Sequence, residues 1–271
     1  MKPIKQLALI LNVHKPNAEA LGKLLQGIAE QHGVATVLST DYPVKTDLLK
    51  GQDACCVIGG DGTLLSTVPE SITHQVPVFG INQGKLGFLA TFSADEAKIH
   101  FEKILMGSYK ISKRSVIFCR TADGQEGYAL NDTVIKSRNI SRLVHLQVYS
   151  NHEWVTEYFC DGLIFSTSTG STAYNLSAGG PIVTPGTGIM TMTPICPHTL
   201  TNRSMVFAHD TLLTVDGKGN ETLPHFSLDG MHCFDHSDVF PIELTTKRGL
   251  LSLLQPEEHS YFQVLRQKLK W

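Results

Sequence analysis

The chain has 271 residues, of which 42% are hydrophobic and 18% are charged, a composition typical of a folded globular protein and not of a disordered one. Its 23 Lys and Arg residues nearly balance its 25 Asp and Glu residues, and the net charge of −2 argues against a nucleic-acid binder that depends on phosphate neutralisation. The length allows one large domain or two domains of ordinary size.

The first third of the chain alternates strand and helix patterns. The apolar run at residues 4–13 predicts a strand buried on both faces, and because no cleavage site follows it we expect no export signal. Apolar residues at helical spacing predict a helix over residues 16–32 that ends at Gly33. Later patterns predict strands at 34–38, 54–58 and 76–81, and a helix at 94–106. Strands separated by helices predict a mostly parallel sheet that is covered on both faces.

From about Tyr109 onward, short β-rich runs alternate with turn signals such as Asp-Gly. They predict an all-β domain of stacked sheets, with strands at 115–120, 129–136, 143–150, 154–160, 205–207, 212–215, 225–228 and 239–244. Residues 257–270 show a helical pattern, and we expect its side with Phe262, Leu265 and Leu269 to pack back on the body. The predicted division is an α/β domain at 1–108, an all-β domain at 109–254 and a C-terminal helical segment at 255–271.

The cysteines indicate thiols and not a metal site. Six cysteines occur singly or as the adjacent pair Cys55 and Cys56. The sequence has no CxxC spacing, so we expect no structural zinc site. The histidines and aspartates within residues 225–238 do not have the spacing of a standard zinc site either. Cys55 and Cys56 lie in an apolar run, so we expect them to be buried. We expect free thiols, a cytoplasmic location and, since no run of about 18 apolar residues occurs, no membrane span.

The segment Gly59-Gly60-Asp61-Gly62-Thr63 directly follows the apolar run at 54–58. Glycines let a backbone approach a ligand closely, and turns after parallel strands are where open α/β sheets bind ligands. The N–H groups of such a turn can bind phosphate oxygens. A carboxylate at this place is suited to hold a metal or to accept a proton from an attacking hydroxyl, and the structural alternative is a helix cap. The segment is neither a Walker A loop nor a GxGxxG motif.

A second candidate segment is rich in hydroxyls, with seven Ser or Thr residues from Ser166 to Ser177. Such a loop can offer hydroxyls and amides to ribose, adenine and phosphate without adding charge. The alternative is a low-complexity linker, but Tyr174 and the flanking apolar residues favour an ordered loop.

These segments resemble the motifs of one family. Residues 59–63 resemble the GGDGT signature that NAD kinases share with diacylglycerol and sphingosine kinases and, as GGDG, with 6-phosphofructokinases. Residues 82–89 resemble the NxGxLGFL stretch of NAD kinases, and residues 129–132 resemble their AxND motif. Residues 161–181 are similar to the family block DGLxxSTPTGSTAYxxSAGGPI. Because the motifs follow in family order from about Ile4 to Leu254, the chain is identified as resembling the NAD kinases.

The resemblance implies a fold and an activity. It implies an NAD kinase-like two-domain fold, with a Rossmann-like α/β N-terminal domain and an all-β C-terminal domain that binds NAD. It implies an ATP-dependent enzyme that transfers the γ-phosphate of ATP to the 2′-hydroxyl of the adenosine ribose of NAD. Mg²⁺ or Mn²⁺ would accompany ATP, with no metal held by the protein alone, and a homodimer or homotetramer is expected.

The resemblance also implies residue roles. Asp61 would accept the proton and Gly62 would contact NAD, while the amides of Gly59, Gly60 and Thr63 would help to hold the triphosphate. Implied contacts to the dinucleotide are Phe88, Asn131, Asp132, Arg142, Asp161, Thr169, Thr172, Ala173, Tyr174, Asn175, Leu176 and Ser177. Phe88 would pack near the adenine, and Arg142 fits an ordinary surface arginine equally well. Phe159 and Met231 stand where relatives have polar residues. The resemblance therefore implies no polar contact to the ligand at these two positions.

Two other functions fit part of the pattern. A GGDGT-type lipid kinase shares the first motif, but the hydroxyl-rich block at 166–177 favours a dinucleotide. A non-catalytic NAD-binding sensor could keep the fold, and the presence of Asp61, Asn131 and Asp161 argues against it. Formation of NADP from NAD and ATP discriminates between the three.

Overall fold

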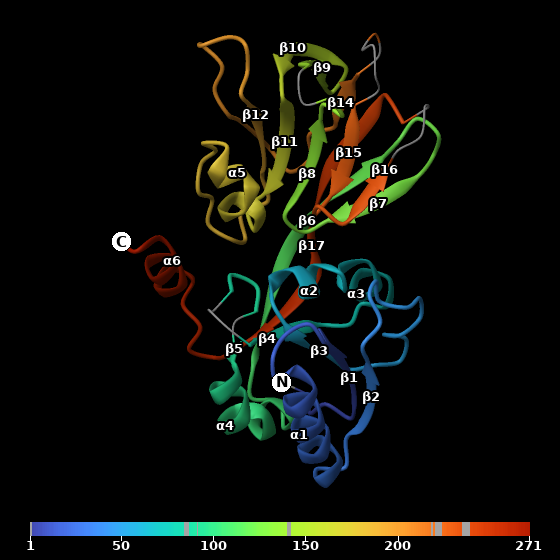
Figure 1. The fold of residues 1–271 in the computed structure, drawn as a ribbon, viewed down its shortest axis with the longest axis vertical. Coiled ribbons are helices and arrows are strands. Elements are labelled where there is room, and N and C mark those ends of the chain that lie inside the picture. The colour runs from blue at the N-terminus through green and yellow to red at the C-terminus, as the bar shows by residue number, and fades with distance from the viewer. Residues whose placement is uncertain are drawn as a thin grey trace. The chain divides into compact units, whose positions relative to one another are not determined.

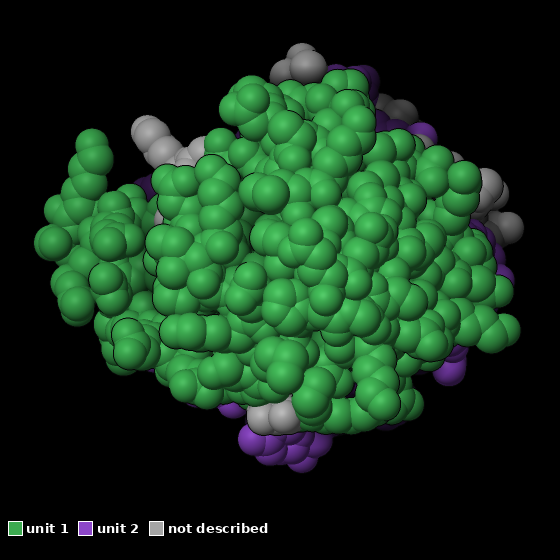
Figure 2. Space-filling view, turned by 90° about the horizontal axis from the view of Figure 1, so that it is seen from below, with its two compact units in different colours: residues 1–113, 251–271 green, residues 114–250 purple. Residues whose placement is uncertain are grey.

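The computed structural model describes residues 2–83, 87–90, 92–139, 142–217, 219, 224–234 and 239–271. The chain forms two compact units, drawn in different colours in Figure 2. Unit 1 consists of residues 1–113 and 251–271, and unit 2 consists of residues 114–250. The chain leaves unit 1 within strand β6 (Lys110–Arg120) and returns to it within β17 (Ile242–Gln255). The C-terminal segment, predicted as a separate part, is therefore grouped with unit 1.

Unit 1 is built on a parallel sheet with the order β17-β4-β3-β1-β2 (Figure 1). Its strands are β1 (Gln6–Leu11), β2 (Ala35–Ser39), β3 (Ala54–Gly59), β4 (Val78–Asn82), the short β5 (Phe92–Ser93) beside β4, and the end of β17. Every residue of β3 is buried, as expected for a strand covered on both faces. The predicted parallel sheet is confirmed.

Two amphipathic helices cover one face of this sheet. Helix α1 (Ala18–Gln31) and helix α4 (Ala94–Leu105) contact each other, and their buried residues share one apolar core with alternate residues of β1, β3 and β4. Ser93 and Glu96 form a reciprocal capping box that starts α4. Both predicted helices are confirmed to within two residues at either end.

Two short helices were missed by the sequence patterns. Helix α2 (Asp61–Leu65) and helix α3 (Val68–His74) occupy the stretch that was expected to be turn-rich. With five and seven residues, they are too short to produce a helical period in the sequence. Helix α2 nevertheless matters for the site, because it contacts β3 and β4 and begins at Asp61.

Unit 2 is built from two antiparallel sheets. The first has the order β10-β9-β14-β17 with β6 and β7 attached, and the second has the order β13-β12-β11-β8-β15-β16 (Figure 1). The strands are β7 (Glu126–Ala129), β8 (Asp132–Lys136), β9 (Val144–Ser150), β10 (Glu153–Cys160), β11 (Gly162–Thr167), β12 (Met190–Ile195), β13 (Met205–Phe207), β14 (Leu213–Asp216), β15 (His225–Leu228) and β16 (His232–Phe234).

The core of unit 2 lies between these sheets and draws on both. Val144, Leu146 and Val148 alternate with less buried residues along β9 and pack in one cluster with Leu163 and Phe165 of β11. The predicted domain of stacked sheets is therefore confirmed. The sequence patterns missed β11, β12 and β16, and they ended β17 at residue 244 although it extends to Gln255. They also predicted one strand at 129–136, where β7 ends at Ala129 and β8 begins only at Asp132. Strand β12 contains Pro194, which is uncommon inside sheets and hides a strand pattern.

The C-terminal helix α6 (Tyr261–Leu269) is shorter than predicted because it begins after Ser260, whose hydroxyl accepts the N–H of Gln263 at 3.4 Å. Of the side that was predicted to pack, Leu265 is buried and Leu269 is half-buried, whereas Phe262 is 56% exposed, so the prediction is wrong for Phe262. Among the helices of the described ranges, none is long and apolar enough to cross a membrane.

Candidate active site

Asp61 lies at the edge of the unit 1 sheet where its parallel strands end. It is the first residue of α2 and follows β3 after Gly59 and Gly60. Strands β1 and β4 pair with β3 in parallel, so their carboxyl ends meet at the same edge, where open α/β sheets bind ligands. Among the residues that the structure describes, no atom outside the turn lies within 4 Å of the place that a β-carbon at Gly60 would take, so the turn is open toward them.

The carboxylate of Asp61 is held by three consecutive backbone N–H groups from another segment. Phe88 donates to Oδ2 at 2.9 Å, while Leu89 and Ala90 donate to Oδ1 at 3.2 Å and 2.9 Å. The side chain does not cap its own helix, so the helix-capping alternative is wrong. A carboxylate can accept about four hydrogen bonds. Oδ2 of the half-buried Asp61 accepts one bond from the described part of the chain, which leaves it a further acceptor position there in a fixed orientation.

Thr63 has a supporting place in this turn. Its side chain is buried, and its hydroxyl accepts the side-chain N–H of Asn12, just after β1, at 3.0 Å. This bond ties the start of α2 to the end of β1. Gly84 to Leu86, in the middle of the stretch that resembles NxGxLGFL, lie outside the described residues.

Gly87 lets the segment at 87–90 come against Asp61. A β-carbon at Gly87 would lie 2.0 Å from Oδ1 of Asp61. Gly87→Ala is therefore expected to displace this segment, to lower NADP formation at least about tenfold and to lower the free energy of unfolding by about 1–3 kcal/mol. Enzyme assay and urea unfolding of the purified variant measure both effects.

Gly27→Ala is the matched control. Gly27 lies in α1 and no atom is within 4 Å of its missing side chain, so alanine is expected to stabilise the helix by about 0.5–1 kcal/mol without changing activity. Normal activity of Gly87→Ala would show that the close approach of residues 87–90 to Asp61 is not needed.

In unit 2, Asn131 lies in the connection between β7 and β8, and Asp132 is the first residue of β8. The N–H groups of Leu130, Asn131 and Asp132 donate to the carboxylate of Asp229 at 2.8, 2.7 and 3.1 Å. The N–H of Asp229 donates in return to the carbonyl of Asp132 at 2.9 Å. In the sequence, Asp229 is recognisable only as part of an Asp-Gly turn, and its role is visible only once the strands are paired.

Asn131 and Asp132 line a cavity of about 250 Å³ together with Ala173 and Tyr174. Its other lining residues are Val134, Lys136, Ser227, Asp229 and Gly230. The Lys136 ammonium lies 4.5 Å from the centre of the Tyr174 ring, which is a cation–π contact. Four residues that were predicted from the sequence to contact the dinucleotide thus line one cavity.

Two carboxyl groups of this cavity titrate near neutral pH. The pKa of Asp132 is raised from its ordinary value of 3.8 to about 7, mainly by burial and also by the nearby Asp229, while Lys136 opposes the rise. Burial also raises the pKa of Asp229 to about 6, although its three backbone N–H partners favour the charged form. The charge of the cavity therefore changes between mildly acidic and neutral pH.

The hydroxyls at the start of the Ser/Thr-rich segment are used inside the protein. Ser166 and Thr167 donate to the carbonyls of Asn131 and Leu130 at 3.3 Å and 2.6 Å, and Ser171 donates to the carbonyl of Ser168 at 2.9 Å. The expectation that this run offers its hydroxyls to a ligand is wrong for these three residues, because a buried hydroxyl needs an internal partner.

Asn175 is likewise committed to the protein. Its side chain is fully buried, and Nδ2 donates to the carbonyls of Ser171 and Pro181 at 3.2 Å and 3.0 Å. Its Oδ1 accepts the hydroxyls of Thr191 and Thr193 at 3.3 Å and 2.8 Å. All four hydrogen-bonding positions of the amide are filled. Asn175 thus anchors helix α5 (Tyr174–Ser177) to β12.

The remaining candidates of unit 2 lie at different places. Asp161 is exposed between β10 and β11. In the pairing of β11 with β8, Ser166 lies opposite Asp132 and Gly162 lies opposite Lys136. Asp161 is therefore roughly 16 Å from Asp132 along the strands. Arg142 is exposed in the connection before β9. The backbone of Thr169 is held by the hydroxyl of Thr167, while Thr172 and Leu176 are half-buried and Ser177 is exposed.

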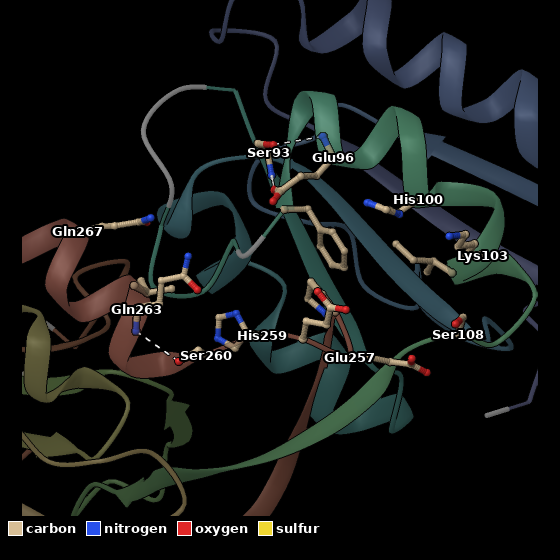
Figure 3. Close-up of a pocket in the computed structure, with 15 residues that line it drawn as sticks. Ser93, Glu96, His100, Lys103, Ser108, Glu257, His259, Ser260, Gln263 and Gln267 are labelled. Atoms are coloured by element: carbon tan, nitrogen blue, oxygen red, sulfur yellow. Dashed lines mark hydrogen bonds between the residues drawn. The ribbon is translucent and has the colours of Figure 1, made fainter.

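Phe88 is half-buried in unit 1, and the ammonium of Lys268 on α6 lies 5.9 Å from its ring centre. A larger cavity of unit 1, about 600 Å³, lies between α4 and residues 256–267. Figure 3 shows His100 and Lys103 of α4 and, from the C-terminal segment, His259 and Gln263 around it. None of the sequence-predicted site residues lines this cavity, and its charged side chains are of both signs.

Comparisons with known proteins decide the family. Residues 8–109 match the family model of the ATP-NAD kinase N-terminal domain, and residues 130–242 match that of the ATP-NAD kinase C-terminal domain. The NAD kinase of Sulfurimonas denitrificans is 36% identical over 100% of this chain and 98% of its own length. That of Geotalea daltonii is 36% identical over 99% of both chains. The chain belongs to the NAD kinase family.

Solved structures agree on the fold. Yeast NADH kinase complexed with NADH superimposes with a TM-score of 0.86 at 22% identity, over 100% of this chain and 89% of that one. The NAD kinase from Archaeoglobus fulgidus in complex with ATP gives a TM-score of 0.79 at 22% identity, over 98% of each chain. The activity of this NAD kinase family member is the ATP-dependent phosphorylation of NAD, which yields NADP. The lipid-kinase alternative is thereby set aside.

Proposed function

We propose that Asp61 accepts the proton of the 2′-hydroxyl of the adenosine ribose of NAD while that oxygen attacks the γ-phosphorus of ATP. A bond forms between the ribose oxygen and the γ-phosphorus, the bond to the β-phosphate oxygen breaks, and ADP leaves. The observation that carries the proposal is the carboxylate that the N–H groups of residues 88–90 fix, with only one of the bonds from the described residues on Oδ2. Such fixing favours proton acceptance because it orients the carboxylate.

The turn from Gly59 to Thr63 is proposed to bind the phosphates of ATP. Its support is the open face at Gly60 and the bond between Asn12 and Thr63, which holds the turn in place. Backbone N–H groups in such a turn suit phosphate oxygens. The neighbouring Gly62 is exposed and is proposed to contact NAD.

The cavity of unit 2 is proposed to bind part of NAD. Asn131, Asp132, Ala173 and Tyr174 line it, and ribose hydroxyls or an amide would find donors and acceptors there. Asn175 is proposed to act by fixing α5 and not by direct side-chain contact. Further proposed contacts to NAD, which stand on the family resemblance, are Phe88, Arg142, Asp161, Thr169, Thr172, Leu176 and Ser177.

A divalent cation, Mg²⁺ or Mn²⁺, is proposed to enter with ATP and to neutralise charge on its phosphates. Within the described ranges, no group of three or more His, Cys, Asp or Glu residues could hold a metal ion. Asp235, His236 and Asp238 lie outside these ranges. Since the three backbone bonds of Asp61 leave little of its carboxylate for a metal, the proposal assigns most cation ligands to phosphate oxygens and water.

A homodimer or homotetramer and a cytoplasmic location complete the proposal. The oligomer rests on the family resemblance, and light scattering of the purified chain measures it. The location is supported by the free cysteines Cys55, Cys56, Cys119, Cys160 and Cys196, since free thiols are typical of reducing compartments.

The decisive experiment follows NADP with purified protein, ATP and Mg²⁺, using NAD or diacylglycerol as the acceptor. We expect NADP to form, and no phosphorylation of the lipid. Binding of NAD without any NADP formation would favour the non-catalytic sensor instead.

A further inference from the structure

Asp229 lies at the tip of the hairpin that joins β15 and β16. Asp229 and Gly230 have φ values of +50° and +65°, and the N–H of Met231 donates to the carbonyl of Leu228 at 2.9 Å, so these two are the central residues of a β-turn within the hairpin. The chain has another Asp-Gly turn at Asp123 and Gly124. The Asp123 carboxylate accepts bonds from Thr121 and Gln125 of its own turn, whereas the Asp229 carboxylate reaches a segment about 98 residues away.

Two of the three N–H groups that Asp229 binds, those of Leu130 and Asn131, lie outside the strands, and the third belongs to Asp132, the first residue of β8. Strand β7 ends at Ala129 and β8 begins at Asp132, so residues 130 and 131 fall in the gap between two strands. Leu130 is fully buried and Asp132 is 6% exposed. Buried N–H groups without a partner are costly, and one carboxylate satisfies all three.

The opposite side of the same backbone is fixed by β11 and the residues after it. The hydroxyl of Thr167 donates to the carbonyl of Leu130 at 2.6 Å, and its N–H donates to the carbonyl of Asn131 at 2.9 Å. A β-carbon at Gly170 would lie 2.0 Å from that carbonyl oxygen. Because the backbone of residues 130–132 is fixed from both sides, the side chains of Asn131 and Asp132 are directed to the remaining side, which is the cavity.

A carboxylate is the side chain that suits position 229. An asparagine would avoid a second negative charge beside Asp132, but its single oxygen accepts about two hydrogen bonds where three N–H groups need partners. The protein therefore keeps two neighbouring acids in a buried place, which costs folding free energy, in exchange for a fixed backbone.

We propose that Asp229 is a positioning residue for NAD binding, which holds the backbone of residues 130–132 so that Asn131 and Asp132 face the dinucleotide. This role rests on the proposed contacts of Asn131 and Asp132 with NAD. Asp229 acts through these two residues and leaves the binding of ATP to the turn at residues 59–63.

Asp229→Asn separates this role from a general structural one. We expect KM for NAD, and the dissociation constant of NAD alone, to rise about 10- to 100-fold, while KM for ATP changes less than about twofold. Asp123→Asn, the same change in the other Asp-Gly turn, is expected to leave both constants unchanged. Circular dichroism and thermal unfolding establish that the variants are folded.

A second variant covers the case in which Asp229→Asn does not fold. Gly230→Ala keeps the carboxylate but strains the turn, whose φ at Gly230 is +65°, and is expected to raise KM for NAD by a smaller factor. An unchanged KM for NAD in a folded Asp229→Asn, or equal rises of both KM values, would overturn the proposal. Asn131→Ala tests the contact of Asn131 with NAD separately from the positioning role of Asp229. An unchanged KM for NAD in Asn131→Ala would mean that this contact is absent.

Discussion

Asp61→Asn is expected to lower kcat for NADP formation by about 10²- to 10⁴-fold, the range that proton acceptance by a positioned side chain contributes. The amide keeps the size of the side chain but cannot take up the proton of the 2′-hydroxyl. Its single oxygen also faces the three N–H groups of residues 88–90, so a smaller rise of KM for NAD is expected. Steady-state kinetics with varied NAD and ATP measure both.

Asp53→Asn is the matched control, since Asp53 also uses a carboxylate to bind backbone N–H groups, those of Lys5 and Gln6 at 2.8 Å and 3.0 Å. It precedes β3 and so lies at the other end of that strand from Asp61, and its variant should keep full kcat. If Asp61→Asn retained near-normal turnover, another group would have to accept the proton. If Gly87→Ala reproduced the whole loss of kcat, the carboxylate would act by holding residues 87–90.

Asp132→Asn is expected to cost activity but to stabilise the protein at pH 8, by at most about 4 kcal/mol. The pKa of Asp132 is raised from 3.8 to about 7 in the folded protein, mainly by burial. The folded state therefore holds its proton more tightly than the unfolded state. The stabilisation that protonated Asp132 contributes is fully present below pH 3.8 and is lost as the pH rises to about 7, because ionising the buried acid opposes folding. Asparagine does not ionise and avoids this loss.

The pH dependence is the sharper part of this prediction. Urea unfolding should show an advantage of Asp132→Asn that grows between pH 4 and 7 and is less than half as large at pH 5 as at pH 8. Asp123→Asn provides the control, since the exposed Asp123 has its pKa lowered by the hydroxyl of Thr121 and the side chain of Gln125 and should gain nothing at pH 8. A gain of equal size at pH 5 and 8 would mean that Asp132 stays charged in the folded protein.

The sequence predicted the parts of the fold whose signal is local. Each central strand of unit 1 is a short apolar run, because both faces are covered, and helices α1 and α4 have a clear apolar side. The place of Asp61 followed from its position after one of these runs. The family motifs added the two-domain fold and the activity, which composition and periodicity could not supply.

What the sequence could not predict depends on partners that are distant along the chain. Asp61 and Asp229 each hold three N–H groups of a segment about 27 and 98 residues away, and nothing near either aspartate in the sequence indicates that segment. Asn175 was proposed as a ligand contact because it lies in a motif, but the pairing of β11 with β12 surrounds it with Thr191 and Thr193. Strand β11 was missed since one residue separates it from β10.

Unit 2 is inserted between two parts of unit 1, and this order has a consequence for synthesis on the ribosome. Leu253 pairs with Val78, and Leu254 belongs to the apolar core that α1 and α4 cover. Unit 2 is one continuous stretch and can fold as soon as it emerges. Unit 1, although its first residues are made earliest, keeps β4 without its β17 partner and its core incomplete until residues 251–271 are translated.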